Sequence, residues 1–144
     1  MMEIDRRNQE QLRVILEKYG WIGSSKIGES AASAFFFIIQ HSNEEMMNEW
    51  FPTLDSLSRV GEANPRYAAM MQDRLLMWQG KKQIYGTQAS DFRVDKQMAI
   101  WPIEDPERVN ERRSKIGFKT TVEEYAASMG VIFNPNDTIP VDRE

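Results

Sequence analysis

The spacing of apolar positions in the first half of the chain predicts helices. Over 5–19 the apolar residues recur at three- and four-residue intervals, and Gly20 follows them as a natural C-terminal stop. The segment 28–41 has a centre that is apolar on nearly every side, and a helix of that kind is usually surrounded by others. We therefore expect 28–41 to be the central helix of the fold, with a buried strand over 35–39 as the alternative.

Two further helices are indicated by their first residues. Asn43 is followed by two glutamates, as is typical of an N-cap with acids in the first turn. Pro52 should kink or divide that third helix, because proline removes a backbone donor. Asn64 and Pro65 form the cap-then-proline signature of a fourth helix, which we expect to end at Gly80.

The pattern changes in the second half of the chain. The stretches 82–88 and 93–101 are extended in character and predict a β-hairpin or a pair of irregular strands. Asp105 and the proline after it open a fifth helix. Thr121 and Glu124 have the spacing of a capping box, which predicts a short sixth helix.

Together these elements predict an α+β fold that is mainly α. We expect five or six helices around the buried central helix over 28–41, with a small hairpin over 82–101. The chain of 144 residues suits one globular domain, which we place over 1–133. The segment 134–144 is polar and contains proline, so we expect a loose C-terminal tail.

Charge and composition narrow the classes of function. Lys and Arg number 18 against 22 Asp and Glu, a net charge of −4, which argues against a nucleic-acid binder. The chain has no Cys, which excludes disulfides, thiolate nucleophiles and the common zinc sites. No segment resembles a membrane span or a secretory signal, so we expect no membrane association and a cytoplasmic protein.

The first group of candidate site residues surrounds the single histidine. His41 follows Gln40 at the polar end of the apolar central helix, and histidine is the commonest acid–base group. Asp73 and Arg74 stand among apolar residues of the fourth helix, where a charge must lie at the edge or be paired. Asp73 would orient His41 and Arg74 would clamp an anion; the alternatives are a capping histidine and a structural ion pair.

The second group lies in the segment 83–88. On a strand, Tyr85 and Thr87 would share one face and Gln88 the other, around a glycine that allows close approach of a ligand or another backbone. Such groups suit recognition of a small polar ligand, and Arg113 would add positive charge to the same cavity. The alternative is a turn whose amides satisfy buried backbone groups.

Several motifs are absent from the sequence. It contains no nucleophile elbow, no glycine-rich phosphate loop and no paired-histidine zinc motif, so we expect no cofactor. A metal site would have only the imidazole of His41 to combine with carboxylates, and we therefore expect no metal.

The combined motifs resemble a known family, the bacterial domain-of-unknown-function family numbered 6624. The resemblance extends over 8–125 and implies that these residues belong to one group; it implies no activity. Where the family pattern continues the Q-H pair with a small residue and then an Asp, this chain has Asn43, which removes a carboxylate. The motifs that carry the resemblance are Gly20-Trp21, Gln40-His41, Asp73-Arg74, Gln83-x-Tyr85-Gly86-Thr87-Gln88 and Asn110-x-Arg112-Arg113-x-x-x-Gly117.

Two functional hypotheses follow. In the first, a pocket binds a small polar or anionic ligand, with His41 and Asp73 available for hydrolytic or group-transfer chemistry. Its ligand-binding residues would be Gln40, Arg74, Tyr85, Thr87, Gln88 and Arg113. In the second, the protein is a non-catalytic module that binds a protein partner, as immunity-type proteins do, and the same polar residues form a structural network. A homodimer through Trp50, Trp78 or Trp101 is compatible with either, and the sequence does not decide whether the protein is an enzyme.

Overall fold

The contacts within the chain divide it into two compact units. The structure is a computed structural model that describes residues 2–141, with side chains from 6 onward. The units are Met1–Met71 and Gln72–Glu144, and the boundary between them falls inside helix α5 (Pro65–Trp78). A single domain over 1–133 stays a prediction.

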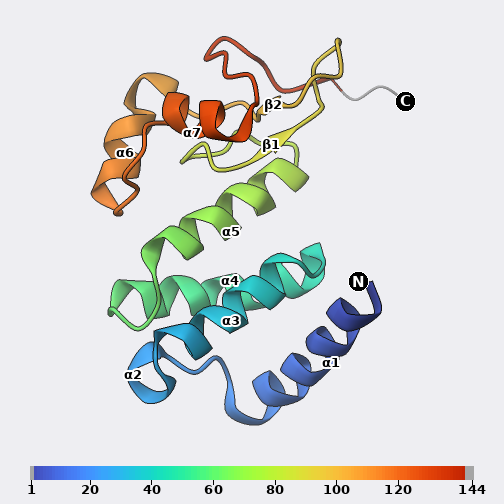
Figure 1. The fold of residues 1–144 in the computed structure, drawn as a ribbon, viewed down its shortest axis with the longest axis vertical. Coiled ribbons are helices and arrows are strands. Elements are labelled where there is room, and N and C mark those ends of the chain that lie inside the picture. The colour runs from blue at the N-terminus through green and yellow to red at the C-terminus, as the bar shows by residue number, and fades with distance from the viewer. Residues whose placement is uncertain (1, 142–144) are drawn as a thin grey trace. The chain divides into compact units, whose positions relative to one another are not determined.

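Among the described residues, the first unit consists of helices joined by loops and contains no strand (Figure 1). The predicted helices are confirmed, and α2 is a further short helix between the first two predicted ones. The elements are α1 (Met2–Tyr19), α2 (Ser24–Ile27), α3 (Glu29–Gln40), α4 (Glu44–Arg59) and the beginning of α5.

Helix α3 is central to the first unit, whereas the sequence predicted it as the central helix of the whole fold. It contacts α1, α2 and α4, and Phe36 and Ile39 are buried in the core. The expectation that it is surrounded on all sides is wrong, because Phe37 is 49% exposed and Ala31 and Ala34 are also exposed. Alanine carries little apolar area, so a run of apolar letters can leave one side of a helix open to solvent.

Local sequence explains where α4 begins. The side chain of Asn43 accepts a hydrogen bond from the amide of Met46 at 2.8 Å, as an N-cap does. Pro52 stands inside the helix without dividing it, and its own side chain is exposed. The inward positions Met47 and Leu54 are fully buried, so packing holds the helix together across the proline.

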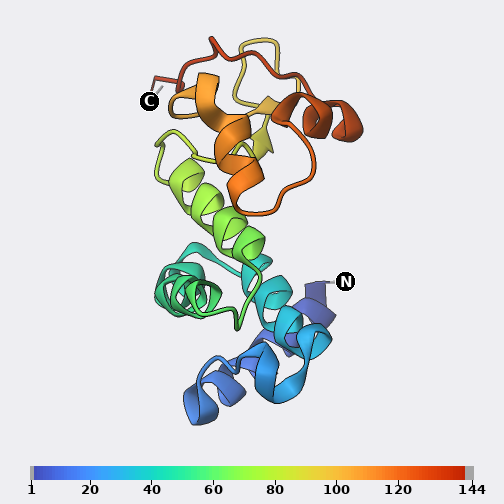
Figure 2. The same cartoon turned by 90° about the vertical axis from the view of Figure 1, so that its left-hand side faces the viewer.

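The second unit combines short helices with a small sheet, which confirms the mainly α, α+β fold (Figures 1 and 2). Strands β1 and β2 are antiparallel, with Ala89 opposite Ile100 and Ser90 opposite Ala99. The elements that follow α5 are β1 (Ala89–Ser90), β2 (Ala99–Ile100), the 3-10 helix Pro106–Arg108, α6 (Val109–Lys115) and α7 (Val122–Met129).

The hairpin differs from its prediction in both length and position. Strand β1 covers only 89–90, outside the predicted stretches 82–88 and 93–101, and β2 covers only 99–100. The segment 83–88 is a loop with a bridge from Gln83 to Ile103. The backbone amides that would pair with a neighbouring strand donate instead to the Asp73 side chain, as described below. Trp101 is only 7% exposed, so it does not offer the exposed surface assumed for a dimer contact. Its indole N–H donates to the carbonyl of Lys81 at 2.7 Å.

The apolar core of the second unit brings the sheet and the last helices together. Its buried members are Ile100, Ile103, Val109, Val122 and Ala126. Helix α7 begins with the predicted capping box, in which Thr121 and Glu124 each bond the other's backbone amide at 3.1 Å.

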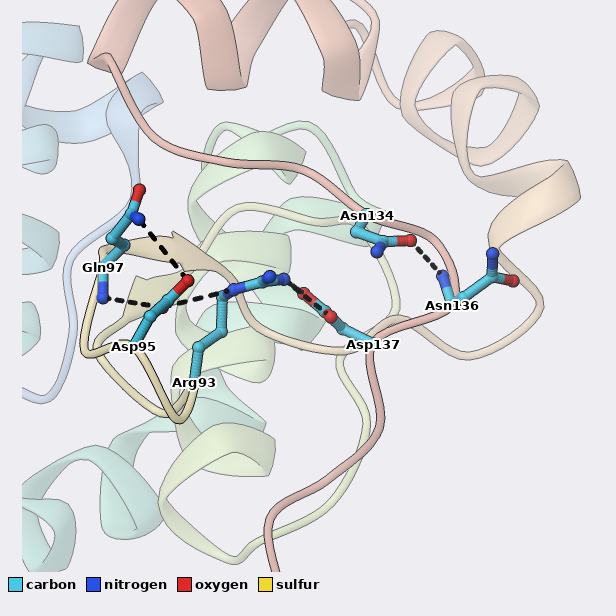
Figure 3. A network of polar contacts seen from close by, with 6 residues as sticks. All are labelled: Arg93, Asp95, Gln97, Asn134, Asn136 and Asp137. Carbon is cyan, nitrogen blue, oxygen red and sulfur yellow. Dashed lines mark hydrogen bonds and ion pairs between the residues drawn. The ribbon is translucent and has the colours of Figure 1, made fainter.

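An ion pair links the C-terminal segment to the loop between β1 and β2 (Figure 3). The Nη1 of Arg93 donates to both carboxylate oxygens of Asp137, at 2.8 and 2.7 Å, and Asp137 is 15% exposed. A loose tail over 134–144 stays a prediction, and its residues 142–144 lie outside the described part of the chain. No helix within residues 2–141 is long and apolar enough to span a bilayer.

Candidate functional site

The carboxylate of Asp73 organises the loop that carries the Y-G-T-Q motif. Asp73 lies on α5 and is fully buried. Its Oδ1 accepts from the amides of Ile84 and Tyr85 at 2.8 and 3.1 Å. Its Oδ2 accepts from the amide and the hydroxyl of Thr87, at 3.2 and 2.8 Å. One side chain thus replaces the backbone partners that these amides would have in a strand.

Gly86 is required at the centre of this loop for two reasons. Its φ is +70°, a left-handed conformation that side chains with a Cβ rarely adopt. A Cβ there would also lie 2.8 Å from Val122 and 3.0 Å from Ile103. The close approach that the sequence associates with a ligand is therefore made by apolar side chains of the core.

A second layer of amides closes the loop on the sheet. The Nε2 of Gln83 donates to the carbonyls of Gln88 and Trp101 at 2.9 and 2.7 Å, and its Oε1 accepts from the amide of Gln88 at 2.9 Å. The side chain of Gln88 donates to the hydroxyl of Thr87 at 3.0 Å and accepts from the Nε of Arg74 at 3.1 Å. These groups satisfy one another inside the unit, as the structural alternative for this segment expects.

Two arginines of α6 hold the other side of the loop. Arg112 donates from its guanidinium to the carbonyls of Ile84, Glu104 and Asp105. Arg113 is 1% exposed and donates to the carbonyl of Tyr85 at 2.9 Å. These arginines thus bind backbone carbonyls of their own chain.

Other segments of the same chain also enclose the Arg113 guanidinium. Its remaining donors reach the carbonyl and hydroxyl of Thr120 at 2.9 and 3.1 Å. It lies 4.6 Å from the ring centre of Phe118 and 5.1 Å from that of Tyr125. The hydroxyl of Tyr125 in turn donates to the carbonyl of Thr87 at 2.9 Å.

Burial dominates the electrostatics of this group. It raises the pKa of the Asp73 carboxyl above its usual range, while the hydrogen bonds from Ile84, Thr87 and Tyr85 oppose the rise. Burial also lowers the pKa of the Arg113 guanidinium, against the attraction of Tyr125 and Asp73. We name Asp73, Gln83, Thr87, Gln88, Arg112 and Arg113 the loop frame, because their side chains hold the loop 83–88.

The structure gathers six of the eight candidate residues in the second unit, namely Asp73, Arg74, Tyr85, Thr87, Gln88 and Arg113. Gln40 and His41 belong to the first unit. Gln40 is 5% exposed and its Nε2 lies 3.5 Å from the carbonyl of Met70. His41 is exposed, ends α3, and its carbonyl accepts from the side chain of Gln9 at 3.2 Å. The pairing of His41 with Asp73 stays a prediction.

The first unit contains a hollow of about 980 Å³. It is bounded by the first half of α3, the last turns of α4 and the beginning of α5. Ala32, Phe36 and Leu54 form its buried floor, and Phe37 and Tyr67 form a wall. We name this hollow the first-unit cleft. Its size falls within the range of small-molecule sites.

Several polar groups that line the first-unit cleft have no hydrogen-bond partner among the described residues. Ser24, Ser33 and Tyr67 line it and are half-buried, and their hydroxyls make no hydrogen bond to any described residue. The Nε of Arg66 donates to Asn64 at 3.3 Å, but its two terminal nitrogens have no acceptor in the described part of the chain. These groups are available to a ligand in a way that the loop frame is not.

The sequence reasoning missed this cleft. Arg66 and Tyr67 follow the helix-start signal Asn64-Pro65, which indicates only where a helix begins. Phe36 and Phe37 belong to the apolar run that predicts the central helix. The available clue was an aromatic and a cation at the exposed first turn of a helix, a pattern that is also common on ordinary surfaces.

The described residues include no three acidic or histidine side chains placed to share a metal ion. The loop frame contains one carboxylate, whose oxygens already accept five hydrogen bonds, so it offers no set of metal ligands.

Comparison with known proteins places the chain in a family. A family model described as "Family of unknown function (DUF6624)" matches residues 1–133, which covers both the loop frame and the first-unit cleft. Searches of curated proteins and of solved structures found no match to the chain.

Proposed function

The chain belongs to the DUF6624 family of unknown function, and we propose that it binds a small polar or anionic ligand in the first-unit cleft. The observation that carries this proposal is the contrast in hydrogen bonding. The cleft has half-buried donors and acceptors with no internal partner, whereas the side chains of the loop frame bond to their own chain. Because an unpaired polar group in a partly dry site gains most from a ligand, the cleft is the better binding site.

In this proposal the loop frame has a structural role. Asp73, Thr87, Gln88 and Arg113 keep the loop 83–88 in place, and no ligand or reacting group needs to contact them. This is the network that the second sequence hypothesis describes, without its protein partner. A role of His41 and Asp73 in hydrolytic or group-transfer chemistry would require the carboxylate to release its loop donors.

The test is a fragment screen by ligand-observed NMR on the wild type and on Ser33→Trp. Ser33 is half-buried and lines the cleft, so a tryptophan there should obstruct it. Ser56→Trp is the matched control, because Ser56 is exposed on α4 and does not line the cleft. We expect polar and anionic fragments that bind the wild type and Ser56→Trp and are lost in Ser33→Trp. Fragments retained by Ser33→Trp, or no binding fragment at all, would refute the proposal.

A further inference from the structure

The wall of the first-unit cleft is an aromatic cluster that is open on one side. The rings of Phe36 and Tyr67 are stacked, with centres 4.3 Å apart and planes 5° apart. Phe37 meets Tyr67 edge-on at 5.4 Å, and Phe37 remains 49% exposed. A fully buried cluster would have no surface left for another ring. Here Phe37 lines the hollow and keeps exposed surface on which a flat group can pack.

A cation without an acidic partner stands at the same cleft. Arg66 is half-buried and forms no ion pair within the described residues, while Asn64 fixes its Nε edge. Its two terminal nitrogens therefore present a planar pair of donors, the arrangement that binds a carboxylate or phosphate through two parallel hydrogen bonds. Arg59 also lines the cleft, but it is paired with Asp55 at 3.0 Å.

One charge at the cleft has the opposite sign. Glu29 is exposed at the beginning of α3 and also lines the hollow. It would repel an anion without contacting it, so its removal should strengthen the binding of an anionic ligand. This gives the test a variant with the opposite expected direction.

Resting on the proposed function, we infer that the ligand of the first-unit cleft combines a flat ring with an anionic group. The ring packs on Phe37 and Tyr67, and the anionic group binds the free edge of Arg66. An aromatic carboxylate and a nucleoside monophosphate share this chemistry. The hydroxyls of Ser24 and Ser33 supply further hydrogen bonds to polar substituents.

The test measures dissociation constants by isothermal titration calorimetry for four probes. They are 2-naphthoate, adenosine monophosphate, 2-naphthylmethanol and cyclohexanecarboxylate. The third probe keeps the ring and lacks the charge, and the fourth keeps the charge and lacks the flat ring. We expect 2-naphthoate, adenosine monophosphate or both to bind at least about tenfold more tightly than the two incomplete probes.

Variants assign each half of the ligand to its residue. Arg66→Gln should weaken the anionic ring probes about tenfold and leave 2-naphthylmethanol unchanged, because it removes only the charge-assisted bonds. Phe37→Leu should weaken the ring probes and leave cyclohexanecarboxylate unchanged. Glu29→Gln should strengthen the anionic probes. Arg13→Gln is the control for net charge, because Arg13 is exposed on α1 and outside the cleft.

The outcomes separate the two proposals. If cyclohexanecarboxylate or 2-naphthylmethanol binds as tightly as the complete probes, and Ser33→Trp abolishes that binding, the inference fails and the proposed function stands. If none of the four probes binds, the inference fails. If Arg13→Gln weakens the anionic probes as much as Arg66→Gln does, the assignment of the anion to Arg66 is wrong. Binding of only one complete probe also supports the inference.

Discussion

The first-unit cleft and the loop frame use polar side chains in opposite ways. In the loop frame, Asp73 and Arg113 are nearly inaccessible and bond to the backbone of their own chain. In the cleft, Arg66 and Tyr67 are half-buried and retain unused bonding groups. The residues of the more unusual sequence motif thus bond within the fold. The less distinctive residues of the cleft keep polar groups that can bond to a ligand. The comparison shows that a polar motif marks a demanding local structure as readily as it marks a site.

The largest expected effect is the loss of the Asp73 carboxylate. Asp73→Ala should lower the free energy of unfolding by at least about 3 kcal/mol, because three buried amides and a hydroxyl lose their acceptor. Chemical denaturation measures this. The control is Asp55→Ala in the first unit, whose exposed ion pair with Arg59 should contribute less than about 1 kcal/mol. Equal stability of Asp73→Ala and the wild type would show that the loop frame is not structural.

The next effect concerns the glycine of the loop. Gly86→Ala should lower the free energy of unfolding by about 2–4 kcal/mol, from a left-handed backbone and from overpacking against Val122 and Ile103. Gly130→Ala separates the two causes, because Gly130 has φ +68° and no atom within 4 Å of the added Cβ. Thermal and chemical denaturation of both variants test this. A loss no greater at Gly86 than at Gly130 would mean that the loop does not pack tightly on the core.

A smaller effect is expected from pH. Burial raises the pKa of Asp73 in the folded protein, so the stability associated with this group is fully present below its unfolded pKa of about 4 and declines as the pH rises through the folded pKa. Asparagine does not ionise. The advantage of the wild type over Asp73→Asn in unfolding free energy should therefore be largest near pH 4 and shrink at higher pH, as measured by denaturation across that range. An advantage that grows with pH would mean that the loop amides outweigh burial.

The smallest effect on stability is expected at the cleft. Arg66→Ala should change the free energy of unfolding by less than about 0.5 kcal/mol, because the terminal nitrogens of Arg66 have no internal partner. The same change at Arg113 should cost about 2–3 kcal/mol, because it leaves the carbonyls of Tyr85 and Thr120 without donors. Denaturation of this matched pair compares the two regions directly. Similar losses at both arginines would remove the distinction between cleft and loop frame.

Local signals in the sequence predicted most of the fold. Asn43 as an N-cap and the capping box of Thr121 and Glu124 act within one helical turn, so they determine where their helices begin. The resemblance to the family, carried by the spacing of short motifs, is confirmed by the family model. The sequence also indicated that the residues of 83–88 and Asp73 belong together, without indicating what holds them.

Only the tertiary structure decided how those residues are used. The segment 83–88 has the pattern of a strand, but its amides bond to a side chain 11 to 14 positions earlier, which no local periodicity can indicate. Phe36 and Phe37 are adjacent in one apolar run, yet one is buried and the other is half open to the cleft. The sequence determined which elements form, because capping and hydrophobic spacing act over a few residues. Contacts between distant segments decide which polar groups bond within the protein and which can bond to a ligand. These contacts exist only in the folded chain.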